Sequence, residues 1–436
     1  MKFKDKHIAI LGAGRSGQAA AALALKHGAR VSLWDQAGPQ AFADLPDEVE
    51  THPDADEAAA GSMQADILVL SPGIDTYGSY VAAYRPRAKE LIGEVELASR
   101  VFKGRLVGIT GTNGKTTTTE LVSCMLAHAG LGGTACGNYG LPFSEVALAE
   151  SQPEVIALEL SSFQLETIEQ LHPMVAVWLN FAPDHMDRYP SVDSYRKAKL
   201  RIFKNVGEGD VVVARWGEAI PDLCATLVTF STEDSEAEWY SDGNEIRCRG
   251  ELVMKMTEET ALRGLHNAEN LMAALAACRA LGIPMAVLSQ ALRNYSPPLH
   301  RCELIRTLDG VEYLNDSKAT NLHALNSALR SQTRPVVLIC GGKDKGLDYT
   351  GVLPMLRERV LAVVTYGEIA GQIAEIIKGH CPCEQLVTLD EAVYKARDLA
   401  ARGSVVLLSP GTSSFDQFTG YQERGDHFRK LVEQLQ

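Results

Sequence analysis

The stretch Leu106-Val-Gly-Ile-Thr-Gly-Thr-Asn-Gly-Lys-Thr-Thr-Thr118 joins an apolar strand to a glycine-rich turn and then to a helix. Gly111 and Gly114 carry no Cβ, so backbone N–H groups of the turn can face an anion. The following helix points its positive dipole end at that anion, and Lys115 adds a full charge. Thr116 offers a hydroxyl to a Mg²⁺ ion that bridges phosphates. The stretch therefore predicts a phosphate-binding loop.

The spacing of this loop departs from the strict pattern G-x-x-x-x-G-K-[ST]. That pattern requires glycine at position 109, where this chain has Ile109, and Gly108 comes one residue too early. The physical parts are nonetheless complete, because residues 117–129 carry apolar side chains at helical spacing and predict the helix that follows the turn. An ordinary strand-to-helix turn that contains a lysine is the alternative interpretation.

The composition is that of a globular multidomain protein. With 436 residues, 46% of them hydrophobic, the chain can bury a large core, and its length suggests about two to four domains. The net charge of -13 argues against a nucleic-acid partner, because no basic cluster offsets it. No apolar run is long enough to cross a bilayer and no cleavable signal pattern is visible, so we expect a cytoplasmic protein without membrane contact. The nine cysteines lack metal or redox spacing and are expected to be reduced.

Short apolar strands alternate with helical patterns along the chain, which is typical of parallel α/β architecture. The alternation starts again at each of three units. We therefore expect a Rossmann-like domain over residues 1–95, a central P-loop-type mononucleotide-binding domain over 96–298 and a C-terminal Rossmann-like domain over 299–436. Ser296-Pro-Pro-Leu299 is expected to be a linker, because consecutive prolines stop a helix.

The N-terminal unit carries glycines at Gly12-Ala-Gly14-Arg-Ser-Gly17 after the expected strand His7–Leu11, and Asp35 closes the next strand. This pattern matches the dinucleotide-binding fingerprint in its structural context. This pattern would bind a nicotinamide cofactor or a sugar nucleotide such as UDP equally well. A glycine turn with a purely structural role is a third interpretation. The separate triphosphate site favours ATP as the energy source over hydride chemistry.

Two acidic or histidine-bearing segments follow strands of the central unit. Glu159 ends an apolar strand, where a second acidic residue usually meets the Mg²⁺ held at a phosphate loop; the alternative is an edge carboxylate in solvent. Asp184, His185 and Asp187 follow another strand and could hold a divalent ion or orient phosphates. A packed or solvated histidine is the alternative for His185.

Lys199 is a lysine on an expected helix that the chain chemistry cannot distinguish from its neighbour Lys197. By default both are expected to be solvated. The residue types and spacing alone give neither of them a function.

Three polar segments of the C-terminal unit each end a strand. They are Asn315–Asn321, Gly341–Gly346 and Ser409–Phe418. Their lysines suit an acidic substrate, and the third segment supplies hydroxyl and backbone donors. Each could be an ordinary hydrated loop, but three such segments at one sheet edge favour a binding site.

Together these segments resemble the Mur ligase family of cell-wall amino-acid-adding enzymes over essentially the whole chain. The markers are Gly111–Thr117, Leu158–Leu165, Asp184–Arg188, His266–Asn270, His300–Arg301, Asn315–Thr320 and Ser409–Phe418. The Ser-Ser-Phe-Gln, Asp-Ser-Lys-Ala-Thr and Phe-Asp-Gln-Phe segments are similar to those of the D-glutamate-adding member. The resemblance implies ATP-dependent ligation of D-glutamate to UDP-N-acetylmuramoyl-L-alanine through an acyl phosphate, in peptidoglycan precursor synthesis. It also implies two Mg²⁺ sites, and we expect a monomer.

The resemblance assigns roles to individual residues of this chain. For ATP it implies Gly111, Thr112, Asn113, Gly114, Lys115, Thr116, Thr117, Asn270, Arg301 and Asp316. For the UDP substrate it implies Arg15, Ser16, Asp35, Gln36, Ser71, Pro72, Gly73, Asn138 and His185. For D-glutamate it implies Lys318, Thr320, Lys345, Ser414 and Tyr421. The implied metal ligands are Thr116, Glu159, His185 and a carbamylated Lys199, and the implied catalytic residues are Lys115, Glu159, His185 and Lys199.

Two positions depart from the family pattern. Tyr421 stands where phenylalanine is expected, and Arg15 stands where an apolar residue is expected, which puts its side-chain contact with the nucleotide in question. A carbamylated Lys199 would also replace the solvated-lysine interpretation, because carbamylation turns a cation into a carboxylate. The alternative functions are a folylpolyglutamate synthetase-like ligase, against which the N-terminal glycine fingerprint argues, a dehydrogenase, and a nucleotide-binding protein without catalysis.

Overall fold

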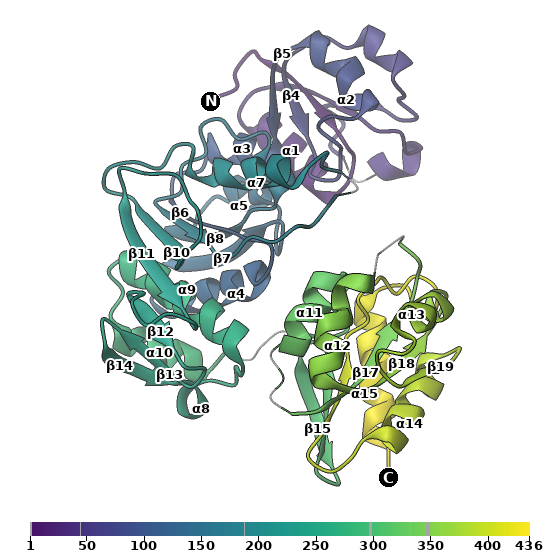
Figure 1. Ribbon diagram of the computed structural model, residues 1–436. Coiled ribbons are helices and arrows are strands. Elements are labelled where there is room, and N and C mark those ends of the chain that lie inside the picture. The colour runs from purple at the N-terminus through teal and green to yellow at the C-terminus, as the bar shows by residue number, and fades with distance from the viewer. Residues whose placement is uncertain are drawn as a thin grey trace. The chain divides into compact units, whose positions relative to one another are not determined.

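The computed structural model describes residues 2–43, 45–186, 188–295, 299–330, 332, 334–345 and 349–436. The described chain forms three helix-covered sheets and divides into two compact units (Figure 1). The first unit contains Met1–Arg263 with Asn267–Tyr295, and the second contains Gly264–His266 with Ser296–Gln436. Of the expected linker, Ser296, Pro297 and Pro298 lie outside the described residues.

The N-terminal sheet is parallel and has the strand order β3-β2-β1-β4-β5, which is the order of Rossmann-type nucleotide-binding sheets. Its strands are β1 (His7–Leu11), β2 (Arg30–Trp34), β3 (Val49–His52), β4 (Ala65–Leu70) and β5 (Ala88–Gly93). Its helices are α1 (Arg15–Lys26), α2 (Ser79–Tyr84) and α3 (Glu94–Ser99), with 3-10 turns η1 (Pro39–Phe42), η2 (Ala58–Ser62) and η3 (Arg85–Arg87). The predicted Rossmann-like architecture is confirmed.

The central sheet has the strand order β14-β13-β12-β11-β10-β9-β6-β8-β7. It is parallel from β7 to β12, whereas β13 and β14 pair antiparallel. The strands are β6 (Arg105–Thr110), β7 (Gly132–Gly137), β8 (Val155–Glu159), β9 (Val175–Trp178), β10 (Val211–Arg215), β11 (Thr226–Ser231), β12 (Trp239–Ser241), β13 (Glu245–Cys248) and β14 (Glu251–Lys255). The helices are α4 (Lys115–His128), α5 (Phe143–Leu148), α6 (Ser162–Leu165), α7 (Val192–Leu200), η4 (Arg201–Phe203), α8 (Met256–Glu259), α9 (Leu265–Ala280) and α10 (Met285–Arg293).

The C-terminal sheet has the strand order β15-β16-β20-β17-β18-β19 and is parallel apart from the β15–β16 pair. Its strands are β15 (Glu303–Leu308), β16 (Val311–Asn315), β17 (Val336–Gly341), β18 (Val360–Tyr366), β19 (Cys383–Gln385) and β20 (Val405–Leu408). Its helices are α11 (Leu322–Arg330), η5 (Tyr349–Val352), α12 (Leu353–Arg359), α13 (Ala370–Ile377), α14 (Leu389–Leu399) and α15 (Tyr421–Gln434). Helices α14 and α15 pack on one face and α11, α12 and α13 on the other, so this sheet is also doubly wound.

The central strands of all three sheets read as uninterrupted apolar runs because helices cover both of their faces. Strands β8, β9, β17 and β20 are buried at every position. The one charged side chain in these four strands, Glu159, lies at the end of its strand. The strand ends are where the sequence motifs lie.

One hydrophobic core is shared by the first two sheets. Helix α1 and helix α3 pack against α5, and a single buried cluster runs from Phe3 and Ile8 through Val95 and Phe143 to Ala214. The C-terminal sheet has separate clusters on its two faces. The N-terminal and central sheets are therefore packed into one body.

Two further expectations concern cysteines and membranes. All nine cysteines are free thiols, and Cys136, Cys278 and Cys340 are buried, as expected for reduced residues in apolar segments. Cys124 is half-buried. Within the described ranges, no helix combines the length and apolar character needed to span a lipid bilayer.

Candidate active site

The predicted phosphate loop lies between the end of β6 and the start of α4. Gly111 and Gly114 have φ angles of +154° and +80°, which L side chains rarely adopt. A Cβ on Gly114 would lie 2.1 Å from Oδ1 of Asn270, and a Cβ on Gly111 would lie 2.9 Å from Cβ of Leu179. The turn therefore requires glycine at both positions, and it places Asn270, an expected ATP residue on α9, against the loop.

Two lysine side chains meet at this loop. Nζ of Lys115 donates to the carbonyl oxygens of Gly111 and Thr112, at 3.0 and 2.9 Å. Nζ of Lys199, on α7, donates to the same Gly111 oxygen at 2.7 Å. The two amines therefore meet at the place where the sequence predicts phosphates.

Lys199 is buried, with 1% of its surface exposed, so its default interpretation as a solvated lysine is wrong. Burial, followed by repulsion from Lys115, lowers the pKa of Lys199 well below its usual value. The side chain of Lys197, in contrast, is 74% exposed and pairs with Asp193. The structure thus separates the two lysines that the sequence alone could not, and it favours a neutral, nucleophilic amine at Lys199.

Glu159 ends β8 beside this loop and is 1% exposed, so the solvent-edge alternative is wrong. Its Oε1 accepts a hydrogen bond from Nδ2 of Asn138 at 2.7 Å. Its Oε2 is buried and has no hydrogen-bond partner among the described residues. A buried carboxylate oxygen without a donor is costly, so the position fits a cation ligand.

His185 sits in a strained turn after β9. Its φ is +56°, and its carbonyl oxygen accepts from the backbone N–H groups of Arg188 and Tyr189, both at 3.0 Å. The imidazole contacts the ring edges of Phe163 and Tyr195, with centroids 4.9 and 5.9 Å away. The neighbouring candidate Asp187 lies outside the described residues.

Metal-binding clusters of three or more His, Cys, Asp or Glu side chains are absent from the described part of the chain. The metal ligands that the resemblance implies do not form a cluster of this kind. They include a single carboxylate and a single imidazole, and the other members are the Thr116 hydroxyl and a modified Lys199.

The N-terminal glycine turn is held by side chains that follow the neighbouring strands β2 and β4. A Cβ on Gly17 would lie 1.8 Å from the carbonyl oxygen of Gly12, whereas a Cβ on Gly14 would meet nothing within 4 Å. Asp35 accepts from the backbone N–H groups of Ala13 and Ala37 at 2.6 and 2.7 Å, and the Ser71 hydroxyl donates to the Gly12 oxygen at 3.0 Å. Asp35 and Ser71 thus shape the turn, while Gly14 leaves its open side accessible.

The other residues expected at the UDP substrate have different exposures, and one of them, Asn138, follows β7 of the central sheet. Arg15 begins α1, and its Nη2 lies 3.1 Å from Oε2 of Glu145 on α5, with both side chains largely exposed. Ser16 and Pro72 are half-buried, and Gln36, Gly73 and Asn138 are exposed. Arg15 therefore contacts the central sheet's helix rather than the turn itself.

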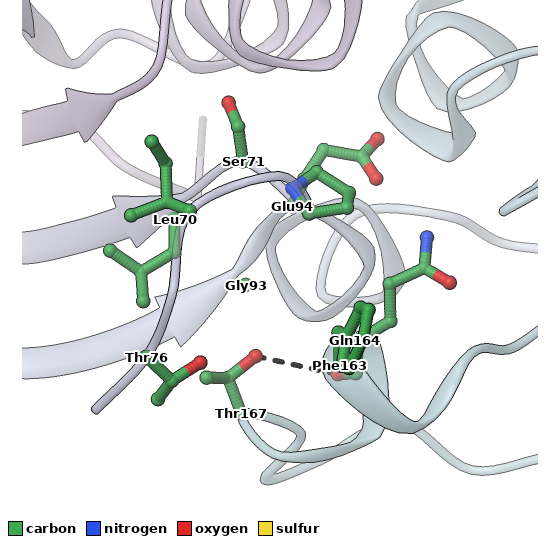
Figure 2. Close-up of a pocket in the computed structure, with 10 residues that line it drawn as sticks. Leu70, Ser71, Thr76, Gly93, Glu94, Phe163, Gln164 and Thr167 are labelled. Carbon is green, nitrogen blue, oxygen red and sulfur yellow. Dashed lines mark hydrogen bonds between the residues drawn. The ribbon is translucent and has the colours of Figure 1, made fainter. Parts of the chain in front are cut away.

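A cavity of about 10 Å³ lies between the N-terminal and central sheets, where segment 70–76 faces α6 (Figure 2). Its lining includes Ser71, Glu94, Gln164 and Thr167. This is about the space of one water molecule. Burial raises the pKa of Glu94 to about 7, although its carboxylate accepts the Ser144 backbone N–H at 2.5 Å.

The residues expected at D-glutamate gather within the C-terminal unit. Nζ of Lys318 lies 3.9 Å from the ring centroid of Tyr421. The tyrosine ring, at a position where the family pattern has phenylalanine, therefore makes a cation–π contact. Nζ of Lys345 lies 3.5 Å from the Thr320 carbonyl oxygen. Ser414 is buried. In the second polar segment, Gly341–Gly346, the last residue lies outside the described residues.

Of the two C-terminal residues expected at ATP, Asp316 is buried and Arg301 is half-buried. Burial raises the pKa of Asp316 to about 7, and the Ser409 hydroxyl donates to its Oδ2 at 2.8 Å. Asp316 therefore links two of the three polar segments.

Sequence reasoning missed Arg424 on α15. This side chain is fully buried, and its guanidinium donates to Oγ and the carbonyl oxygen of Ser317, at 2.9 and 2.8 Å, and to the Thr412 oxygen at 3.2 Å. It thereby joins the segments around residues 315–321 and 409–418. The available signal was its spacing from Phe428 and Leu431, which places it on the buried face of the helix.

Comparison with known proteins matches every part of this architecture. Residues 6–93 match the Mur ligase MurD-like N-terminal domain, residues 109–278 the Mur ligase middle domain, and residues 300–411 the Mur ligase glutamate ligase domain. A UDP-N-acetylmuramoylalanine--D-glutamate ligase of Salinibacter ruber is 40% identical over 98% of this chain and 97% of its own length.

Solved structures show the same fold at lower identity. UDP-N-acetylmuramate-alanine ligase MurC of Thermotoga maritima has a TM-score of 0.61 at 16% identity, covering 98% of this chain and 99% of its own. MurF ligase of Thermotoga maritima, solved in complex with ADP, has a TM-score of 0.59 at 17% identity, covering 86% of this chain and 96% of its own. The chain belongs to the Mur ligase family, and within it to the D-glutamate ligases.

Proposed function

We propose that this protein uses ATP to join D-glutamate to UDP-N-acetylmuramoyl-L-alanine. Its relatives are named UDP-N-acetylmuramoylalanine--D-glutamate ligases, which supports the two substrates. The observation that carries the proposal is the charge arrangement at the phosphate loop. Lys115 and Lys199 share the Gly111 carbonyl, and the buried Glu159 offers an unpaired oxygen nearby. A glycine turn with the Lys115 amine at its carbonyl oxygens and a buried carboxylate beside it suits the binding of a triphosphate with its metal ion, and phosphoryl transfer.

The reaction begins with phosphoryl transfer to the substrate carboxylate. Backbone N–H groups of the loop and Lys115 bind the β- and γ-phosphates. A carboxylate oxygen of the L-alanine residue attacks the γ-phosphorus, ADP leaves, and an acyl phosphate forms. Lys115 reduces the repulsion between these two anions and stabilises the charge that develops during transfer.

The second step makes the amide bond. The D-glutamate amine attacks the acyl carbon, the bond to phosphate oxygen breaks, and the nitrogen loses a proton as inorganic phosphate leaves. Lys318 and Lys345 bind the carboxylates of D-glutamate, with Thr320 and Ser414 as hydroxyl donors and Tyr421 as the packing ring.

Divalent cations fit the residues around the loop. Thr116, Glu159, His185 and carbamylated Lys199 would hold two Mg²⁺ ions, which supply electrostatic screening of the phosphate charges. The lowered pKa of Lys199 supports carbamylation, because the neutral amine is the form that attacks carbon dioxide. The new C–N bond forms with loss of one proton and leaves a carboxylate-like anion beside Glu159.

The N-terminal turn binds the uridine diphosphate part of the substrate. Gly14 leaves the open side of the turn free for diphosphate oxygens, and Ser16, Gln36 and the Ser71–Gly73 segment surround it. The domains extend over residues 1–95, 96–298 and 299–436, and the protein acts as a cytoplasmic monomer without nucleic-acid partners.

Phosphate release, measured with purified protein, ATP, Mg²⁺ and the UDP substrate, tests the proposal. Release should depend on D-glutamate and should be absent with L-alanine or a diamino acid. Release that depends on another amino acid would contradict the assigned substrate. ATP binding without any release would instead support a nucleotide-binding protein without catalysis.

A further inference from the structure

Arg188, at the end of the segment that carries His185, contacts both of the first two sheets. Its Nη2 lies 3.1 Å from Oε2 of Glu166, at the end of α6. On its other side, Nη2 lies 3.4 Å from the Thr76 hydroxyl and Nε lies 3.6 Å from Oδ1 of Asp75, both in the segment after β4. The side chain is 12% exposed, so these contacts are made in a largely desolvated setting.

Glu166 is the buried member of this pair, with 1% of its side chain exposed. Its second oxygen accepts a hydrogen bond from the Tyr189 hydroxyl at 2.5 Å. Arg188 and Tyr189 are the same two residues whose backbone N–H groups close the turn on the His185 carbonyl. Glu166 thus fixes the end of the turn that bonds back to His185, whose backbone is left-handed.

The ring of Phe163 completes the contact with His185. The Arg188 guanidinium lies 3.8 Å from its centroid, and the imidazole of His185 lies against the same ring at 4.9 Å. A guanidinium stacked on an aromatic ring is held in orientation as well as position. Moving Arg188 would therefore move the surface on which the imidazole rests.

We propose that Arg188 and Glu166 form a positioning pair that sets His185 relative to the segment Ser71–Thr76. This inference rests on the proposed function, because Ser71–Gly73 is assigned there to the UDP substrate, and the family resemblance implies His185 both at that substrate and as a metal ligand. Arg188 acts through these neighbours and is not assigned a contact with the reacting atoms. Its loss should affect the UDP substrate more than ATP or D-glutamate.

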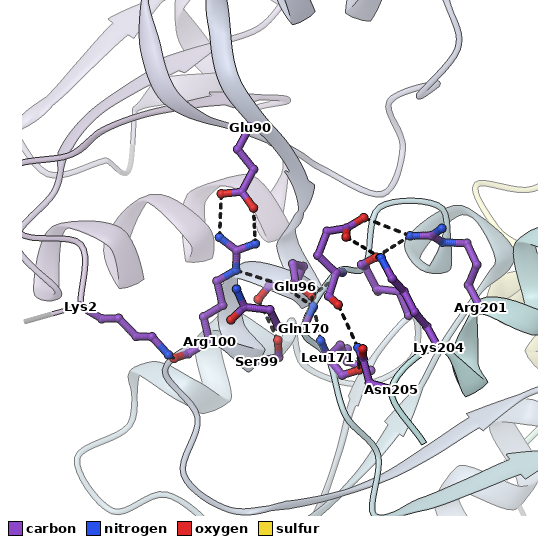
Figure 3. Close-up of polar contacts among 12 residues, drawn as sticks. Lys2, Glu90, Glu96, Ser99, Arg100, Gln170, Leu171, Arg201, Lys204 and Asn205 are labelled. Atoms are coloured by element: carbon purple, nitrogen blue, oxygen red, sulfur yellow. Dashed lines mark hydrogen bonds and ion pairs between the residues drawn. The ribbon is translucent and has the colours of Figure 1, made fainter. Parts of the chain in front are cut away.

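A second polar contact between the same sheets provides the control (Figure 3). Glu96 of α3 is fully buried and accepts backbone N–H groups of residues 169–171, while Arg100 binds Glu96 and Glu90. None of these residues belongs to the assigned substrate segments. Arg100→Lys therefore perturbs the junction of the sheets without touching the proposed pair.

The experiment compares Arg188→Lys with Arg100→Lys in the full-length protein. Lysine keeps the charge at position 188 but cannot span Glu166 and Thr76 while stacked on Phe163. We expect Arg188→Lys to raise the KM for UDP-N-acetylmuramoyl-L-alanine about tenfold and to lower kcat, with the KM for ATP within about twofold. Arg100→Lys should leave all three KM values within about twofold.

A spectroscopic measurement separates this inference from the proposed function. The imidazole ¹⁵N and ¹³C signals of His185, assigned with a His185→Gln variant, should shift in Arg188→Lys and remain in place in Arg100→Lys. Failure of wild-type protein to release phosphate would reject the proposed function and leave this result standing. Unchanged His185 signals together with an unchanged KM for the UDP substrate would overturn the positioning pair.

Asp75→Asn tests the same pair from its exposed side. The Asp75 side chain is 53% exposed, so this variant should fold even where a change at buried Glu166 prevents folding. It should raise the KM for the UDP substrate by about two- to threefold, in the same direction as Arg188→Lys. A uniform change in all three KM values in both variants would indicate a structural role only.

Discussion

The two glycine-rich turns of this protein share a strand–turn–helix shape but are stabilised differently. The N-terminal turn is held by neutral and acidic groups, since Asp35 and Ser71 bond its backbone and Gly14 faces open space. The central turn brings the amines of Lys115 and Lys199 to one carbonyl. The two turns thus share only the order strand, turn, helix, and the side chains that reach each turn from elsewhere in the fold differ, which is the basis for the different roles proposed for them.

Removing charge from the central turn should have the largest effect. Lys115→Ala should lower kcat by about a thousandfold or more, because the lysine stabilises charge that develops during transfer. Phosphate release provides the measurement, and a wild-type far-UV circular dichroism spectrum shows that the fold is retained. If Lys115→Ala kept a kcat within tenfold of wild type, the proposed role of lysine charge at the central turn would be wrong.

A methyl group added to each turn should separate them by stability. Gly114→Ala forces a side chain into a φ of +80° and against Asn270, so we expect a loss of about 3 kcal/mol in the free energy of unfolding. Gly14→Ala has a φ of -68° and no neighbour within 4 Å, so its unfolding free energy should change by less than about 0.5 kcal/mol. Urea denaturation measures the free energy of unfolding of both variants. Equal losses in the two variants would show that the two turns do not differ in their need for glycine.

The junction of the two sheets that carry these turns should respond to pH through Glu94. Its pKa is about 7 in the folded protein against an ordinary value of 4.5, so the unfolded chain releases this proton first. Stability should therefore fall as pH rises from about 4.5 to 7 and level off above that. Glu94→Gln should be more stable than wild type by about 2 kcal/mol at pH 8 and equal to it at pH 4.

Denaturation at the two pH values provides that measurement. A stability difference that does not depend on pH would show that Glu94 acts through packing and not through its charge.

The smallest effect is expected at Arg15, which follows the open side of the N-terminal turn. Its ion pair with Glu145 is largely exposed, so Arg15→Ala should change the unfolding free energy by less than about 0.5 kcal/mol. The KM for the UDP substrate should change by less than about threefold. A larger rise in that KM, measured by phosphate release, would show that Arg15 binds the nucleotide directly.

The strands and the loops at their ends were predictable because parallel strands covered on both faces are uninterrupted apolar runs. The strand at His7–Leu11 has the bounds that the sequence indicates. Strands β13, β14 and β15 pair antiparallel with their neighbours. This pairing could not be predicted, because the sequence of a short alternating segment does not specify its partner strand. Local pattern determines which segments form strands, and long-range packing determines their order.

Side-chain environments were less predictable than strands. Lys199 and Lys197 lie two residues apart on one helix, and only the packing of the phosphate loop against that helix distinguishes them. Arg188 and Glu166 are 22 residues apart and acquire their partners from two different sheets. Contacts of this kind arise from tertiary structure, and no local periodicity records them.

The core shared by the first two sheets has a consequence for how the protein unfolds. Because Val95 and Phe143 belong to the same buried cluster, separating the N-terminal sheet from the central one would expose apolar surface on both. Calorimetry should therefore show these two sheets melting in one cooperative transition, with the C-terminal sheet free to melt in another. The three sheets should therefore unfold as two cooperative units. A stable fragment would have to contain both the N-terminal and the central sheet.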